Sequence, residues 1–105
     1  MRWLERLTRR SGPSVAERME AALAHARSGD HAAALAIWGP LAHAGVARAQ
    51  NNVGACFAEG LGVERDPVLA ARWLGLAAEA GDPVGRRNLA ALHFRGDGVE
   101  RDDAR

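Results

Sequence analysis

The sequence predicts an all-α fold, a superhelical solenoid of antiparallel helical hairpins, on three observations. Of its 105 residues 48% are hydrophobic, but alanine dominates them and aromatic residues make up only 5%. This composition suits helices that approach each other closely. Glycine and proline recur at regular intervals and divide the chain into short helical pieces. The segment GLGVERD at 60–66 returns as GDGVERD at 96–102, which indicates an internal repeat.

The first helix is marked at both ends. Ser14 followed three residues later by Glu17 matches a capping box, in which each side chain accepts a hydrogen bond from a backbone amide of the first turn. Gly29 can adopt the left-handed conformation that ends a helix. A helix is therefore expected over 15–28.

The second and third helices follow from the same kind of signal. Asp30 can cap a helix over 31–44. Pro40 lies inside it, removes one backbone hydrogen bond and predicts a kink. The next helix is expected over 46–59 and ends at Gly60.

The last two helices each begin with an Asp-Pro pair, which places an acidic cap before a proline at the first helical position. Asp66 precedes a helix over 67–80, and Asp82 precedes one from 83 to about 95. The glycines of the 60–66 loop allow backbone angles that other residues avoid. Val63 is expected to be the apolar plug beneath that loop.

Superposing the chain on itself with an offset of 36 residues aligns both halves without insertions. A period near 36 with two helices per unit indicates an α-solenoid, in which each hairpin packs only on its neighbours. We divide the chain into a basic amphipathic segment at 1–13 and a repeat domain at 14–105, with repeats at 14–45 and 46–81 and a partial repeat at 82–105. The matches include Ala34 with Ala70, Ala44-Gly45 with Ala80-Gly81, Asn52 with Asn88, and Gly60, Gly62, Val63 and Asp66 with Gly96, Gly98, Val99 and Asp102.

These residues resemble the Sel-one-like repeat (Sel1-like, SLR) family, relatives of the tetratricopeptide repeats. The resemblance covers about 15–105 and implies a right-handed α-α superhelix that acts as a protein-interaction scaffold. Some secreted members staple each repeat with a disulfide, which a chain with one cysteine cannot do. The motif appears as Ala49, Val53-Gly54, Phe57, Gly60-Leu61-Gly62-Val63, Asp66, Ala70, Trp73-Leu74, Ala77-Ala78 and Gly81, and in part again as Leu89-Ala90, Gly96-Asp97-Gly98-Val99 and Asp102.

No catalytic, metal or cofactor site is predicted. No two histidines are three or four residues apart, so no helix offers a ready pair of metal ligands. Cys56 is expected to be a buried, inert thiol. The glycine-rich loop lacks the Lys-Ser/Thr pair of a phosphate loop and follows no strand. The histidines are His25, His31, His43 and His93.

By resemblance to tetratricopeptide domains, the first helix of each hairpin lines a concave groove. Spacing alone puts Arg87, Ala91 and Arg95 on one helical face. A solvated charged surface is one interpretation; a basic groove that binds a partner's carboxylates, with Asn51 bonding its backbone, is the other. The expected groove residues are Arg27, Arg48, Asn51, Glu59, Arg87, Ala91, Phe94 and Arg95, together with Met19, Leu23 and Ala55.

The main functional prediction is a non-catalytic scaffold that binds a protein or peptide and needs no cofactor. The basic-groove interpretation favours an acidic partner. Fourteen arginines, no lysine and thirteen acids give a net charge of +1, so nucleic acid is not an expected partner. The alternatives are a hydrolase of the kind attributed to secreted relatives, and a binder of anionic membranes or nucleic acids. The latter would use the N-terminal arginines Arg2, Arg6, Arg9 and Arg10.

The segment MRWLERLTRR lacks the continuous apolar stretch of a secretory signal, and no stretch is long enough to span a membrane. A cytoplasmic location is therefore expected.

The sequence also predicts which large side chains are buried. Trp38 and Trp73 should be largely buried and Trp3 exposed. The helix at 83–95 lacks a following helix over its outer face, so incomplete burial is expected for part of it. This predicts either a longer natural protein or self-association through the C-terminal end. The residues concerned are Leu89, Leu92 and Phe94.

Overall fold

The computed structural model describes Trp3 and residues 12–96. That part of the chain consists of five α-helices and contains no strand, so the predicted all-α fold is confirmed. Each helix has thirteen residues, and no boundary differs from its predicted position by more than one residue. The helices are α2 (Val15–Arg27), α3 (His31–His43), α4 (Ala47–Glu59), α5 (Pro67–Glu79) and α6 (Pro83–Arg95).

The predicted caps are present. The Ser14 hydroxyl accepts a hydrogen bond from the Glu17 amide at 3.1 Å, and the Glu17 carboxylate accepts one from the Ser14 amide at 2.8 Å. This charge-assisted contact lowers the pKa of Glu17. Aspartates cap α3, α5 and α6 in the same way, each accepting from the amide three residues ahead. They are Asp30, Asp66 and Asp82.

Pro40 lies inside α3, and the helix continues through it to His43. The kink itself stays a prediction.

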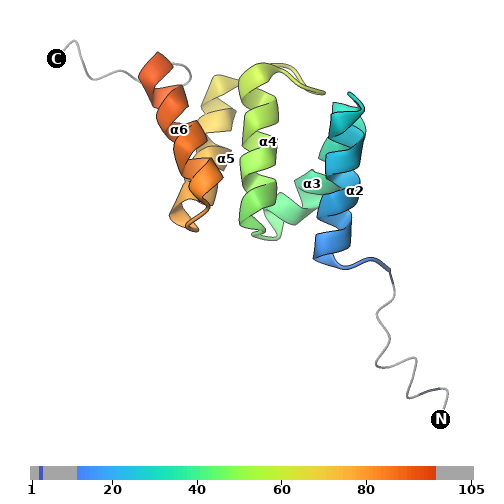
Figure 1. Cartoon of the computed structure of the whole chain (residues 1–105). Coiled ribbons are helices and arrows are strands. Elements are labelled where there is room, and N and C mark those ends of the chain that lie inside the picture. Colours follow the sequence, from blue (N-terminus) through green and yellow to red (C-terminus); the bar gives the residue numbers. More distant parts are fainter. Residues whose placement is uncertain (1–2, 4–11, 97–105) are drawn as a thin grey trace.

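The helices form two layers (Figure 1). α2, α4 and α6 lie in front, with α3 and α5 behind them. Each helix packs against the next along the chain, and α4 also contacts α6. α4 and α6 both approach α5 closely: a Cβ on Gly54 would lie 2.8 Å from Cγ of Leu74, and one on Gly85 would lie 2.7 Å from Cβ of Ala77. The absence of a side chain at these two glycines therefore leaves room for the crossings with α5.

The loop between α4 and α5 is held against α3. A Cβ on Gly62, whose φ is +75°, would lie 2.8 Å from the backbone nitrogen of Ala32. The Asp66 amide donates to the carbonyl of Phe57 at 2.8 Å. The loop thus packs on the N-terminal end of α3, and its glycine leaves room for that contact. Val63, the predicted plug, is partly buried against the core.

The core comprises two clusters of buried residues. The first joins α2, α3 and α4 and consists of Ala22, Ala34, Trp38, Leu41, Ala42, Ala49, Val53 and Cys56. The second joins α4, α5 and α6 and consists of Ala58, Ala70, Leu74 and Leu92. Phe57 packs against both clusters, so it connects them.

The tryptophan predictions are confirmed for Trp38, which is 4% exposed, and for Trp3, which is 62% exposed. Trp73 is only partly buried, less than predicted. Its indole meets the imidazole of His43 edge-on, with ring centroids 5.0 Å apart. It lines an open pocket between α3 and α5, which accounts for the difference.

The predictions for α6 are confirmed in part. Phe94 is 88% exposed, as expected. Leu92 is only 1% exposed, so its predicted incomplete burial is wrong. The reason is that it points back into the second cluster, beside Leu74, and needs no following helix. Leu89 is partly buried against the same cluster.

Candidate functional site

Two pockets open on the front layer. One, of about 380 Å³, lies between α2 and α4. The other, of about 180 Å³, lies between α4 and α6. We call the surface that carries them the α2–α4–α6 face. The first pocket is lined by Ala16, Met19, Glu20, Leu23, Arg48 and Asn52, and the second by Ala55, Ala58, Glu59, Leu74, Asn88, Ala91, Leu92 and Arg95.

Helical spacing explains why these residues share one surface. On α4 the lining positions Arg48, Asn52, Ala55 and Glu59 are four, three and four residues apart, which places them on one side of the helix. The 36-residue repeat puts Asn88 of α6 at the position of Asn52 in α4. Equivalent asparagines therefore stand on neighbouring helices of the same face.

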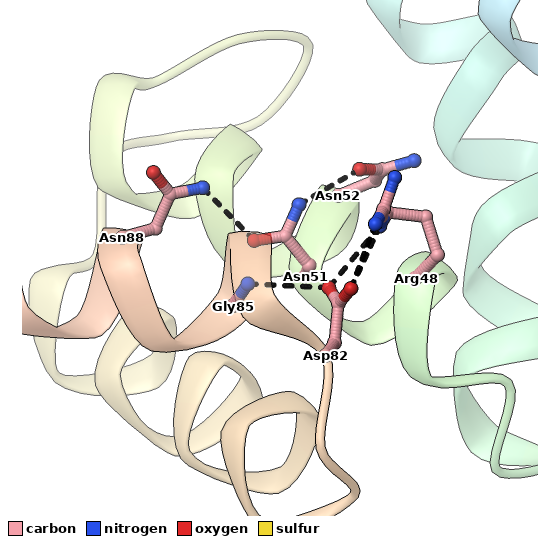
Figure 2. Close-up of polar contacts among 6 residues, drawn as sticks. All are labelled: Arg48, Asn51, Asn52, Asp82, Gly85 and Asn88. Carbon is pink, nitrogen blue, oxygen red and sulfur yellow. Dashed lines mark hydrogen bonds and ion pairs between the residues drawn. The ribbon is translucent and has the colours of Figure 1, made fainter.

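A row of three amides connects these helices (Figure 2). Nδ2 of Asn88 donates to Oδ1 of Asn51 at 2.9 Å, and Nδ2 of Asn51 donates to Oδ1 of Asn52 at 3.0 Å. Asn51 is 3% exposed, at the centre of the row. The row leaves a donor, Nδ2 of Asn52, and an acceptor, Oδ1 of Asn88, without a partner among the residues described.

An ion pair ties the start of α6 to α4. Nε of Arg48 donates to both carboxylate oxygens of Asp82, at 3.0 and 3.1 Å, and Nη2 donates to one of them at 2.8 Å. The Asp82 side chain is 6% exposed and that of Arg48 is 49% exposed. These hydrogen bonds lower the pKa of Asp82, against the opposing effect of burial, and they raise the pKa of Arg48.

A second, weaker pair spans the same two helices. Nη2 of Arg95 lies 3.4 Å from Oε2 of Glu59, and both side chains are about half exposed. The arginines that line the two pockets, Arg48 and Arg95, are therefore already paired with carboxylates of this chain. Arg27 and Arg87 are exposed and have no ion pair within the described residues.

The structure brings some predicted groove residues together and separates others. Arg48, Glu59, Ala91 and Arg95 line the pockets, as do Met19, Leu23 and Ala55. The prediction that Asn51 binds a partner's backbone is wrong, because this side chain is buried. Its neighbour Asn52 faces the pocket instead. The alignment of Asn52 with Asn88 in the 36-residue repeat is the sequence signal that could have identified this pair.

Two of the predicted groove residues on α6 do not line the pockets. Arg87 and Phe94 are exposed outside the pocket lining, although Arg87 lies one turn before Ala91 on the same helical face. Arg27, in the last turn of α2, is exposed and lies four residues beyond Leu23, on the same side of the helix. Its role in binding stays a prediction.

A further pocket, which sequence reasoning missed, lies behind the front layer. It measures about 400 Å³ and is almost entirely apolar. The lack of a side chain at Gly39 helps to form it, since a Cβ there would meet nothing within 4 Å. Its lining residues are Leu35, Gly39, His43, Val53, Phe57, Val63, Leu69 and Trp73.

The described residues offer little reactive chemistry. Cys56 is 3% exposed, as predicted, and burial raises the pKa of its thiol. It is therefore protonated at neutral pH and a poor nucleophile. Residues 12–96 and Trp3 contain no group of three His, Cys, Asp or Glu side chains arranged to hold a metal ion. Within the same part of the chain, no helix is long and apolar enough to cross a membrane.

These features define a helical repeat protein with a face of mixed polar and apolar residues on one layer. The Sel1 repeat pattern matches residues 47–82 and 83–105, more than half of the chain, so the chain belongs to the Sel1 repeat family. The fold is similar to the crystal structure of a Sel1 repeat protein from Oxalobacter formigenes, with a TM-score of 0.73 and 24% identity. That match covers 81% of this chain and 34% of the other, so this chain spans about a third of its length. A search of curated proteins found no match.

Proposed function

We propose that this chain is a non-catalytic protein-interaction scaffold that binds an extended segment of a partner on the α2–α4–α6 face. Sel1 repeat proteins generally act as protein-interaction scaffolds and are typically non-catalytic. The observation that carries the proposal is the pair of unpartnered amide atoms on Asn52 and Asn88. One is a donor and the other an acceptor, which are the two groups that any polypeptide main chain can satisfy.

The pocket beside Asn52 supports binding of a side chain next to the anchored main chain. Met19 and Leu23 give it an apolar wall, and Leu23 is 40% exposed. Small-molecule and side-chain sites combine such apolar walls with a few well-placed polar groups. A partner segment would thus place an apolar side chain between α2 and α4 while its main chain bonds to the asparagines.

The charges around the two pockets favour recognition of a partner's main chain over recognition of its acidic side chains. Asp82 and Glu59 already neutralise the arginines of the pockets, and Glu20 adds a further carboxylate. An acidic residue of the partner would pair with Arg27, at the edge of the face. The cytoplasmic location stays a prediction, and the N-terminal arginines of the anionic-surface alternative lie outside the described residues.

Selection from a displayed library of random twelve-residue peptides tests the proposal. Peptides enriched on the full chain should bind about five- to tenfold more weakly after Asn52→Ala, which removes a hydrogen bond to the peptide worth about 1 kcal/mol and also the acceptor of the Asn51 amide. Leu23→Glu should weaken them through the neighbouring pocket.

Arg72→Ala is the matched control, because Arg72 is exposed on α5 in the other layer. Circular dichroism would show that each variant is folded. Failure to enrich any peptide, or peptides that bind all variants equally, would contradict the proposal.

A further inference from the structure

The apolar pocket behind the front layer lies inside the helical array. We call it the α3–α5 pocket. Its lining comes from α3, α4, α5 and the loop over 60–66, and described helices lie on both sides of these elements, α2 before them and α6 after them (Figure 1). The lining residues are Leu35, Gly39 and His43 of α3, Val53 and Phe57 of α4, Val63 of the loop, and Leu69 and Trp73 of α5.

The size of the α3–α5 pocket suits a small molecule. Its volume is about 400 Å³, and small-molecule sites typically measure about 300–1,000 Å³. A Cβ on Gly39 would meet nothing within 4 Å, so α3 leaves space at this point. A single turn of an α-helix, about 5.4 Å long and 10 Å across, already occupies a similar volume. The pocket is therefore too small for a helix of a partner protein.

The lining excludes charged ligands. Among the described residues that line the pocket, none carries a carboxylate or a guanidinium, and only His43 and Trp73 have polar side-chain atoms. A charged molecule would lose its hydration there without gaining a counter-charge, which is costly. The ligand that fits is uncharged.

Aromatic rings in the lining narrow the class further. Phe57 and Trp73 are only partly buried, so part of each ring is free to contact a ligand. Contacts between aromatic rings contribute more than the burial of their area alone. The imidazole of His43 lies at right angles to the indole of Trp73, with ring centroids 5.0 Å apart. The polar atoms of the pocket are thus gathered around this one ring pair.

We propose that the α3–α5 pocket binds a small uncharged aromatic molecule that carries one hydroxyl or N–H group. Its ring contacts Phe57 and Trp73, and its polar group lies beside the imidazole of His43. Phenol and indole are the simplest members of this class. The site goes beyond the proposed function, because it lies behind the α2–α4–α6 face and shares no lining residue with the two pockets there.

Titration of the full chain with phenol, cyclohexanol and benzoate, followed by nuclear magnetic resonance, tests the proposal. The indole N–H signal of Trp73 should shift most. Those of Trp38, buried in the first cluster, and Trp3, which is 62% exposed, should shift little. Phenol should bind about tenfold more tightly than cyclohexanol, because of the ring contacts, and about tenfold more tightly than benzoate, because of its charge.

Two variants fill the pocket. Gly39→Leu places a side chain in the open space and should abolish the phenol-induced shift. A side chain directly before Pro40 disfavours helical backbone, so Leu69→Trp, which fills the pocket from α5, is the second blocking variant. Gly75→Leu is the matched control: Gly75 is the repeat counterpart of Gly39, a Cβ there also meets nothing within 4 Å, and it does not line the pocket.

A further variant tests the polar end of the pocket. His43→Phe keeps a ring beside Trp73 but removes the imidazole nitrogens. It should weaken phenol binding about three- to tenfold, the effect of one lost hydrogen bond. Benzene, which has no polar group, should bind this variant and the wild type equally.

Asn52→Ala, on the α2–α4–α6 face, should leave phenol binding unchanged, so this proposal and the proposed function can fail independently. Three outcomes would overturn the proposal. They are no saturable shift of the Trp73 signal with phenol, equal binding of cyclohexanol and phenol, and undiminished phenol binding by both blocking variants when circular dichroism shows them folded.

Discussion

Asp82 has two roles that depend on its charge to different degrees. As the cap of α6 it accepts a hydrogen bond from the Gly85 amide at 3.2 Å, which an asparagine could also accept. As the partner of Arg48 it takes three charged hydrogen bonds across α4 and α6. Only the second role requires the carboxylate, so the two can be separated by one substitution.

Asp82→Asn should lower the free energy of unfolding by about 1–2 kcal/mol at neutral pH, a figure reduced because Arg48 is half exposed. The hydrogen bonds from Arg48 lower the pKa of Asp82 in the folded state. Its contribution to stability is therefore present above the unfolded pKa, about 3.9, and is lost as the pH falls through the lower folded value. Urea denaturation from pH 7 to pH 2 should show this loss in the wild type and less of it in the variant.

Asp66→Asn is the control, since Asp66 caps α5 in the same manner but has no arginine partner in the described part of the chain. It should change stability little at any pH. If both variants lose the same stability, the ion pair contributes nothing beyond the cap.

At the scale of elements, the loop over 60–66 explains why the chain repeats one motif. It ends α4, lies on the backbone at the start of α3, and delivers the cap of α5. Gly60 and Gly62 have nearly the same positive φ, +73° and +75°. Their surroundings differ: a Cβ on Gly60 would meet its nearest atom at 3.4 Å, whereas one on Gly62 would overlap α3 at 2.8 Å.

The two glycines therefore form a matched pair for mutation. Gly60→Ala should destabilise the protein by about 1–2 kcal/mol, the cost of a left-handed conformation for a residue with a side chain. Gly62→Ala carries the same cost and about 1–3 kcal/mol more, because the atoms it would overlap belong to the backbone. Urea denaturation measures both values. Equal losses would show that the loop can move away from α3.

The helices were predictable because the residues that begin and end them act locally. Caps such as Ser14 and Asp30 and the glycines that follow each helix fix the boundaries without reference to the rest of the fold. The rotation of each helix about its axis is different, because packing sets it. A one-residue error turns a helix by about 100°, which is the difference between Asn51 and Asn52. In an alanine-rich helix the apolar residues do not single out one face, so the sequence alone does not determine this rotation.

At the scale of the whole molecule, stability is divided between two core clusters. The first lies among α2, α3 and α4 and the second among α4, α5 and α6, with Phe57 packed against both. No cluster contains buried residues from both α2 and α6. In such a linear arrangement each helix is stabilised chiefly by its neighbours.

This arrangement predicts that a cavity at one end weakens that end most. Leu92→Ala removes a side chain that is 1% exposed, at a cost of about 2–5 kcal/mol. Amide hydrogen exchange should then accelerate in α6 and α5 more than in α2 and α3, because local opening follows local contacts. Leu41→Ala, in the first cluster, is the matched control and should give the opposite pattern. Equal acceleration across all five helices in both variants would instead mean that the two clusters unfold as a single cooperative unit.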